Sequence, residues 1–347
     1  MLKFQRQYKL SISTVHSTGP ADTANGITID STIAPLTCEF TLNRESLSSV
    51  QSGTIKIYNL NVSHRELIFK DSYDTETSNN RWIKLEAGYD GSMSQILNGL
   101  IQECSSYRES GGVNIITEIG VLDYSTVYTQ SDSSWTLSPP EYTLPITQQT
   151  VVNRLVKDIT TNIPGTQAGV TAPIDSSGAP VFSAIHSSPV VVSGSTWDAL
   201  LHETNGDGHW YIENGIINYL GDNDALQVGG STALVVEADT GLLSTPRKRG
   251  AYLTLEMLFE PTIRIGQLVK LQSLFPLYNN PNAINSGNVN APYYKVVGYD
   301  HQATISGAVC GKCTTTLRLN SGILKFNQQT NHFEATTASL ASLPGAI

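Results

Sequence analysis

The stretch that decides the fold reads GTIKIYNLNVSHRELIF at residues 53–69 and RWIKLEAGYDGSMSQILNGLI at residues 81–101. Three β-like runs lie here, Thr54–Leu60, Trp82–Tyr89 and Gln95–Glu103. In the first, Thr54, Lys56 and Tyr58 alternate with Ile55, Ile57 and Asn59. A period of two is typical of half-buried strands. Nothing in this stretch resembles a catalytic constellation, so the pattern predicts a β scaffold.

A short helix is expected between the first two of these strands, over Ser63–Phe69. Ser63 and Glu66 have the spacing of a capping box, in which both side chains satisfy the first free N–H groups of a helix. The pair Asp90-Gly91 is a strong turn signal that returns the chain into the third strand.

The order of these signals resembles the N-terminal domain of the baseplate hub proteins of contractile-tailed bacteriophages. The resemblance is carried by Ile57-Tyr58-Asn59-Leu60, the short helix, Leu85-Glu86-Ala87-Gly88-Tyr89, the turn and Ile96-Leu97-Asn98-Gly99. A second match, near residues 240–320, includes Gly241-Leu242-Leu243, Phe259-Glu260-Pro261 and Ile265-Gly266-Gln267-Leu268-Val269. The resemblance implies a homotrimer that joins the tail tube to the central spike, with two tube-like β domains in each chain.

The composition bounds the class of protein. A chain of 347 residues is long enough for two or three domains. Its net charge of −9 argues against a nucleic-acid-binding surface. Only 15% of the residues are charged, below the roughly 25% of ordinary soluble domains. This composition favours a β-rich protein with many turns and broad contact surfaces.

The sequence also bounds the compartment. The N-terminus lacks the apolar core of a signal peptide, and no apolar run approaches the ~20 residues of a membrane span. We therefore expect synthesis in the cytoplasm of a host cell and no membrane span. The four cysteines, Cys38, Cys104, Cys310 and Cys313, fit a reducing compartment.

The middle of the chain predicts a small α+β insertion. Residues 128–145 and 162–188 are expected to be loops, because they are rich in Pro, Gly, Ser and Thr. Helical spacing of apolar residues predicts a helix over Gln148–Thr161. A second helix is expected to begin at Ser195, its capping residue. An Asn-Gly pair at Asn214-Gly215 predicts a hairpin.

The remaining strands are expected on both sides of this insertion. They cover residues 4–14, 26–42, Ile115–Leu122, Tyr252–Leu258, Thr262–Leu271, Tyr293–Val297 and Thr314–Leu319. An internal repeat aligns Trp82–Leu85, Gly88-Tyr89-Asp90 and Ile115–Leu122 with Leu268–Leu271, Gly298-Tyr299-Asp300 and Thr314–Leu319. The predicted fold is mainly β with a small α+β insertion and two related tube-protein-like β-barrel or sandwich domains. The expected boundaries are 1–127, 128–240, 241–325 and a polar C-terminal tail, 326–347.

The sharpest candidate motif is Cys310-Gly311-Lys312-Cys313. A structural zinc site needs a second pair of ligands, and no second CxxC occurs, although His301 lies nine residues upstream. The motif therefore favours a structural role, with redox cross-linking second and metal binding third. Neither a metal nor a cofactor is predicted.

Three further groups allow a functional and a structural interpretation. His202, Glu203, Asp207, His209 and Glu213 suggest hydrolysis or metal binding, but no HExxH motif occurs. Trp210, Tyr211 and Tyr219 could stack on sugar rings, although aromatic pairs also stabilise hairpins. The basic cluster Pro246–Gly250 is either a solvated turn or a partner for acidic residues of a neighbouring subunit. The structural interpretation is favoured for each group.

The sequence thus predicts a structural virion protein and no enzyme. The partners implied by the resemblance are two further copies of the chain, the tail tube protein, the central spike protein, other baseplate proteins and viral DNA in transit. One alternative is a β-rich carbohydrate-binding module using Trp210 and Tyr211. Another is a tail-associated cell-wall hydrolase using Glu203 with His202 or His209.

Overall fold

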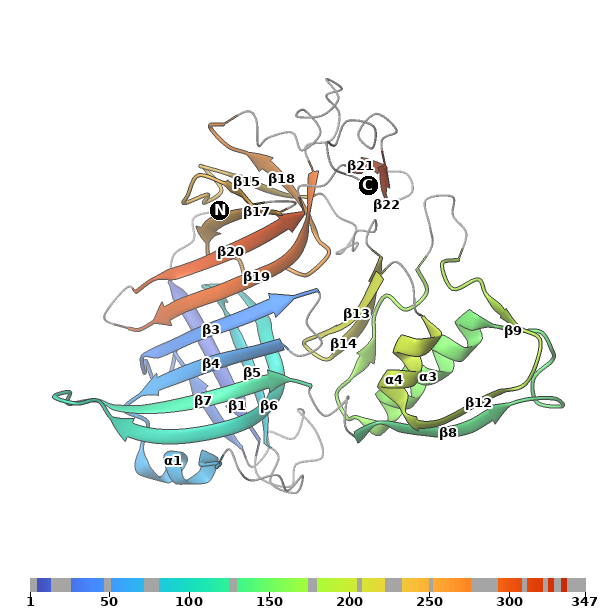
Figure 1. Ribbon diagram of the computed structural model, residues 1–347. Helices are drawn as coiled ribbons and strands as arrows, with labels where there is room; N and C mark the ends of the chain where they lie inside the picture. Colours follow the sequence, from blue (N-terminus) through green and yellow to red (C-terminus); the bar gives the residue numbers. More distant parts are fainter. Residues whose placement is uncertain are drawn as a thin grey trace.

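The computed structural model describes residues 5–13, 26–46, 51–71, 81–124, 130–173, 180–204, 208–221, 233–249, 252–275, 293–307, 311–320, 324–327 and 332–335. Thirteen strands form a single sheet, and smaller sheets accompany two helices beside it (Figure 1). The prediction of a mainly β fold with an α+β insertion is confirmed. No helix in these ranges is long and apolar enough to cross a membrane.

The first β unit contains seven strands and one short helix. They are β1 (Arg6–Ile12), β2 (Ile27–Asp30), β3 (Cys38–Glu45), β4 (Gln51–Tyr58), α1 (Val62–Ile68), β5 (Trp82–Tyr89), β6 (Ser92–Arg108) and β7 (Ile115–Asp123). Strands β1 and β5 lie behind β3, β4 and β7 (Figure 1). Apolar residues from all seven strands fill the core between these layers.

Two expectations for this unit are corrected. The run 26–42 is not one strand, because Asp30 accepts hydrogen bonds from the N–H and hydroxyl of Thr32 and turns the chain between β2 and β3. Helix α1 is capped by Asn61 rather than Ser63, since Asn61 Oδ1 accepts from the His64 N–H at 2.8 Å. The helix begins at Val62, one residue before the expected range Ser63–Phe69, and its capping residue lies two residues before Ser63.

The insertion follows β7 and contains seven short strands and two helices. They are β8 (Asp132–Leu137), β9 (Ile146–Thr147), α3 (Gln148–Asn162), β10 (Gln167–Ala168), β11 (Ile185–His186), β12 (Val190–Ser195), α4 (Thr196–Glu203), β13 (Gly208–Glu213) and β14 (Ile216–Gly221). Both helices and the hairpin were predicted, and Ser195 caps α4. The expected loops 128–145 and 162–188 contain strands, which form through pairing between β8 and β12 and between β9 and β11.

The second β unit contains β15 (Leu234–Glu237), β16 (Arg247–Arg249), β17 (Tyr252–Leu258), β18 (Leu268–Gln272), β19 (Tyr293–Ile305) and β20 (Cys313–Asn320). The expected strand Thr262–Leu271 is mostly wrong, because Glu260 accepts from the Thr262 N–H and hydroxyl in a turn before β18. A last pair, β21 (Leu324–Asn327) and β22 (His332–Ala335), forms a hairpin across the expected boundary between the second β domain and the tail.

The two β units share one strand order. In the first, β3-β4-β7-β6-β5 are neighbours in space, and in the second, β16-β17-β20-β19 are followed by β18 on the far edge of β19. Each of the two long strands has a bulge close to the point where one partner strand ends. In β6 the bulge at Ile101/Glu103 follows the end of its pairing with β5, and in β19 the bulge at Val296/Gly298 follows the end of its pairing with β18. The repeat therefore correctly matched β5 with β18 and β7 with β20. Its Gly-Tyr-Asp element was wrong, because one copy ends β5 in a turn and the other lies inside β19.

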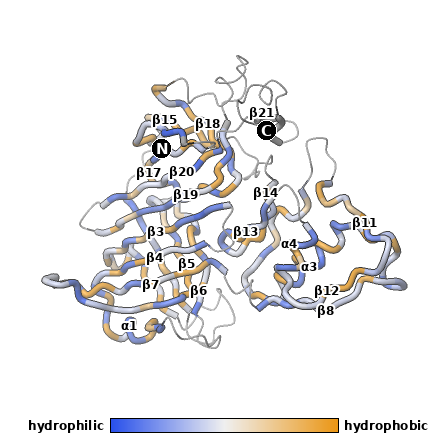
Figure 2. The backbone as a smooth tube through the Cα atoms, in the orientation of Figure 1, coloured by the Kyte–Doolittle hydropathy of each residue, from blue (hydrophilic) through white to orange (hydrophobic). Residues whose placement is uncertain are grey.

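A single antiparallel ladder joins the two units. Strand β3 pairs with β19 over eight residue pairs, from Cys38–Ile305 to Glu45–Gly298. An eight-strand path, β16-β17-β20-β19-β3-β4-β7-β6, therefore runs through both units without interruption. Hydrophobic and hydrophilic residues alternate along these strands (Figure 2), so one face of the path covers the cores and the other faces outward.

Candidate functional site

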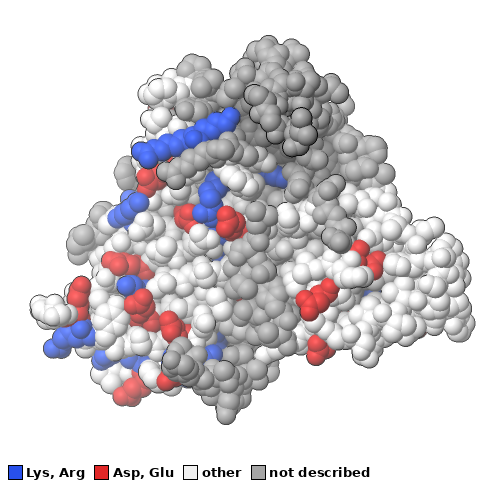
Figure 3. Space-filling model, in the orientation of Figure 1, with Lys and Arg blue, Asp and Glu red and all other residues white. Residues whose placement is uncertain are grey.

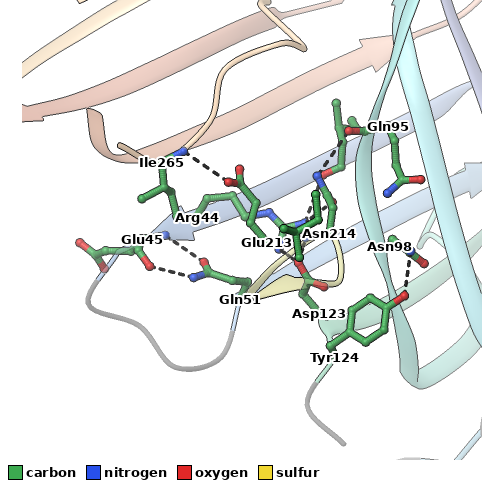
Figure 4. Close-up of polar contacts among 12 residues, drawn as sticks. Arg44, Glu45, Gln51, Gln95, Asn98, Asp123, Tyr124, Glu213, Asn214 and Ile265 are labelled. Carbon is green, nitrogen blue, oxygen red and sulfur yellow. Dashed lines mark hydrogen bonds and ion pairs between the residues drawn. The ribbon is translucent and has the colours of Figure 1, made fainter. Parts of the chain in front are cut away.

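Three parts of the chain meet at a buried polar cluster, which we call the junction (Figure 4). Its charged members are Arg44 of β3, Asp123 of β7, Glu213 of β13 and Arg264 of the turn before β18. The first two come from the first β unit, Glu213 from the insertion and Arg264 from the second β unit. The junction therefore connects all three parts.

An ion pair forms the centre of the junction. Arg44 Nη1 lies 2.6 Å from Asp123 Oδ2, and both side chains are almost fully buried. Arg44 Nη2 also donates to the Ile96 carbonyl at 3.1 Å and to Asn214 Oδ1 at 3.3 Å. The Asn214 N–H donates to the same Asp123 oxygen at 2.8 Å. The turn of the hairpin is thus attached to the first β unit through both members of the pair.

Glu213 attaches the same hairpin to the second β unit. It accepts a hydrogen bond from the Tyr299 hydroxyl and another from the Ile265 N–H, at 3.4 Å. Arg264 donates from the turn before β18 to the Gln95 carbonyl of β6, at 3.4 Å. These contacts cross from one unit to another, so they fix how the hairpin sits between the two β units.

Burial dominates the electrostatics of the junction. It raises the pKa of Asp123 to about 6, although Arg44 and the Asn214 N–H favour the ionised carboxylate. Burial also raises the pKa of Glu213, with Arg264 acting in the opposite direction. Unpaired charges would be expensive in this environment, so the arrangement of two cations and two carboxylates compensates charge within the cluster.

His301 packs beside the junction on β19. Its ring is fully buried against Tyr299 and Phe259, and Nδ1 lies 2.9 Å from the Thr315 hydroxyl. Burial, together with the positive charges of Arg44 and Arg264, lowers its pKa to about 3. His301 is therefore neutral at ordinary pH and belongs to the core.

The hairpin β13–β14 contributes its two faces to two cores. Trp210 and Tyr219 point into the core of the insertion, where both rings contact Phe182. Tyr211 and Leu220 point into the core of the second β unit. Because Trp210 is 5% exposed and Tyr211 is 0% exposed, neither ring is available to stack on a sugar, and the alternative based on these residues is wrong.

The outward side of the eight-strand path forms a second feature, which we call the polar face. Its described charged residues are Glu39, Glu45, Lys56, Glu103, Glu118, Arg247, Glu256, Asp300, Lys312 and Arg318. Carboxylates outnumber basic groups in this set, and several pair across strands, as Lys56 does with Glu118 at 3.4 Å and Arg318 with Asp300 at 3.0 Å. Charged side chains gather over this sheet, while the same view of the insertion shows few (Figure 3).

The sequence candidates for hydrolysis are not brought together. Glu203 contacts His186 of β11 at 2.7 Å, a residue that the sequence did not single out. His202 is exposed, Glu213 belongs to the junction, and Asp207 lies outside the described residues. Within the described ranges, no group of three or more His, Cys, Asp or Glu residues is placed to hold a metal ion.

The cysteine motif is described only in part. The Cys313 side chain is buried in the core of the first β unit, and Cys310 lies outside the described residues. Cys38 and Cys104 are buried free thiols in the same core, and burial raises the pKa of Cys104 to about 12. The three described thiols therefore behave as apolar core residues.

Comparisons with known proteins give structural matches only. No protein-family model matches the chain, and no curated protein sequence matches it. The 43 kDa tail protein of prophage MuSo2 from Shewanella oneidensis is 6% identical, with a TM-score of 0.52 over 91% of this chain and 98% of that one. The tail protein from Neisseria meningitidis MC58 is 10% identical, with a TM-score of 0.50 over 91% and 96%. The chain therefore has the overall fold of these tail proteins, as the resemblance implied.

Breaking the central ion pair should destabilise the protein strongly. We expect Arg44→Met and Asp123→Asn each to lower the free energy of unfolding by about 3–5 kcal/mol, because each leaves a buried partner uncompensated. The double variant Arg44→Met/Asp123→Asn should lose clearly less stability than the sum of the two single changes. Denaturant unfolding measures these values.

The half-exposed ion pair between Lys56 and Glu118 is the control. Lys56→Ala should lower the free energy of unfolding by less than about 1 kcal/mol. Additive losses at Arg44 and Asp123 would contradict the role given to this pair.

His301 should make the free energy of unfolding depend on pH. The unfolded side chain takes up a proton near pH 6.5, whereas the folded one does so only near pH 3. The free energy of unfolding should therefore fall as pH drops below 6.5, by up to about 1.4 kcal/mol per pH unit from this group. His301→Gln should flatten this slope, measured by urea unfolding from pH 7 to pH 4, and His202→Gln should not. Equal slopes in all three proteins would refute the assignment.

Proposed function

We propose that the chain is a structural protein of a phage tail, acting as the baseplate hub that connects the tail tube to the central spike. Three copies would close into a ring of six similar β units around a channel. The observation that carries this proposal is the duplicated strand order joined by the β3–β19 ladder. Two equivalent units in one chain allow a threefold assembly to match a sixfold tube.

The chemistry of the polar face supports a channel through which DNA passes. A surface rich in Lys and Arg would hold phosphates by releasing their counterions. The polar face instead carries more carboxylates than basic groups among its described residues, and many of its charges are already paired across strands. DNA would therefore slide along such a surface without strong binding.

The remaining parts have roles in the same proposal. The chain would divide into β domains at 1–127 and 241–325, with the insertion 128–240 and the segment 326–347 available for contacts with the spike and other baseplate proteins. The protein would be made in the host cytoplasm and would reside in the virion tail. It would have no catalytic activity and no cofactor.

The proposal predicts the mass of the assembly in solution. Light scattering over a range of concentrations should give three times the 37.5 kDa mass of the chain. The trimer should persist on dilution, because permanent ring interfaces bury about 2,000 Å² or more. A monomer at every concentration would contradict the proposal. A trimer that dissociates on mild dilution would also contradict a permanent ring.

A further inference from the structure

A groove lies at the outer end of the second β unit. The connector Leu242–Pro246 forms one wall, Gln272–Phe275 at the end of β18 form the other, and Glu237–Asp239 complete the lining. The groove encloses about 380 Å³. Pockets that bind small ligands have volumes of roughly 300–1,000 Å³. The groove therefore has room for an aromatic side chain and a residue beside it.

The groove is apolar and open to solvent. Leu243 is 51% exposed, Leu274 is 92% exposed and Phe275 is 49% exposed. These three side chains line the groove together with Leu242 and Pro246. Exposed apolar residues that gather around a concave surface mark a site for a partner.

The duplication places one wall of the same site on the first β unit. Strands β5 and β18 are equivalent residue by residue, because Trp82 and Leu268 each pair one position before the bulge of the neighbouring long strand begins. Counting onward from these two residues makes Tyr89 equivalent to Phe275.

The opposite wall has an equivalent as well. Strand β3 corresponds to β16, because they pair with the equivalent strands β4 and β17. The register through β7 and β20 makes Asn43 equivalent to Arg249. Counting back from these two residues makes Phe40 equivalent to Pro246. The groove thus corresponds to the space between Phe40 and Tyr89 in the first unit.

In the first unit this space is occupied. Phe259, directly after β17, packs between Phe40 and Tyr89, with ring centroids 5.9 Å and 6.3 Å away. The Tyr89 hydroxyl donates to the Phe259 carbonyl at 2.9 Å. The Phe259 side chain is fully buried there. The site therefore accepts an aromatic ring that a turn of another unit presents.

A further copy of the chain would not supply an equivalent ring. Phe259 follows β17, and the residue that follows the equivalent strand β4 is Asn59. Asn59 Nδ2 donates to Asn114 Oδ1 at 3.0 Å, and Asn59 Oδ1 accepts from the Ile115 N–H at 3.1 Å. A polar side chain that is bonded within its own unit does not fill an apolar groove. The groove thus fits a different partner.

The lining of the groove favours a positive charge on that partner. Glu237 and Asp239 are the charged residues of the lining. Within the described ranges, neither carboxylate takes part in a side-chain hydrogen bond or an ion pair. The basic residues Arg247–Arg249 form β16 rather than a solvated turn and do not line the groove. A lysine or arginine beside the inserted ring would therefore meet complementary charge.

We propose that the groove is a docking site for an adjoining protein of the tail, which inserts an aromatic side chain next to a lysine or arginine. The placement of this partner rests on the proposed function, because a ring of three copies would present three such grooves around its axis. A partner with threefold symmetry would occupy all three at once, and the linked contacts would raise its affinity.

A dipeptide that carries only these two features tests the proposal. Saturation-transfer NMR of the full chain should show that acetyl-Phe-Lys-amide binds, with the strongest transfer to its aromatic protons. Acetyl-Phe-Glu-amide should bind about fivefold more weakly, because its carboxylate would face those of the groove. Glu237→Gln/Asp239→Asn should remove this difference between the two dipeptides.

The apolar walls are tested separately. Leu243→Ser/Leu274→Ser should weaken the binding of acetyl-Phe-Lys-amide by about tenfold, because the ring would lose apolar contact area. Both leucines are at least half exposed, so this variant should keep the thermal stability of the native chain. The matched control Val191→Ser changes an apolar residue of β12 that is 69% exposed, and it should bind the dipeptide as the native chain does.

Light scattering on the same samples separates this inference from the proposed function. A trimer that binds both dipeptides equally, or neither, would overturn the docking site and leave the hub proposal standing. A monomer that prefers acetyl-Phe-Lys-amide would support the docking site and overturn the hub. Unchanged binding by Leu243→Ser/Leu274→Ser would place the dipeptide outside the groove and overturn the site. If that variant does not fold, the comparison of the two dipeptides on the native chain decides.

Discussion

The antiparallel ladder between β3 and β19 is the contact on which the rest of the structure depends. Its eight residue pairs connect strands that are about 260 residues apart in the sequence. Without this ladder the two β units would keep side-chain contacts with each other but would not share a sheet. With it, one sheet crosses both units and presents a continuous polar face. Backbone hydrogen bonds set the register, and a one-residue slip would exchange the core and outward faces of every side chain.

The junction connects both strands of this ladder to one hairpin of the insertion. Arg44 lies on β3 itself, and Tyr299 lies on β19, so the hydrogen bonds of both strands extend to the same hairpin turn. Buried ion pairs contribute little net stability compared with apolar packing. Their requirement for exact partners disfavours other arrangements of the same three parts, because a misplaced hairpin would leave charges buried and unpaired.

The sequence predicted local elements well and long-range contacts poorly. Strands β5 and β17 begin and end where their alternation predicted, and the Asn214-Gly215 turn forms with both residues at positive φ. Strand β8, in contrast, reads DSSWTL and becomes a strand only through its partner β12, more than fifty residues away. Its residues carry no strong pattern of their own, so the signal lay in a contact that a single sequence does not display.

The junction shows the same limit for the functional site. Arg44 follows Cys38, Phe40 and Leu42 on the apolar phase of β3, so its burial could have been predicted from spacing alone. Its partner Asp123 could not, because the pair depends on how β7 reaches β3 through β4. Glu213 was singled out for hydrolysis, but its hydrogen bonds with Tyr299 and Ile265 give it a structural role.

Electron cryomicroscopy of the purified chain tests the central claim most directly. The account predicts a closed threefold ring in which six similar β units surround an open channel, and in which the polar face, with Lys56, Asp300 and Glu256, lines that channel. A ring whose polar face lies on the outside, or an open filament of chains, would contradict the account.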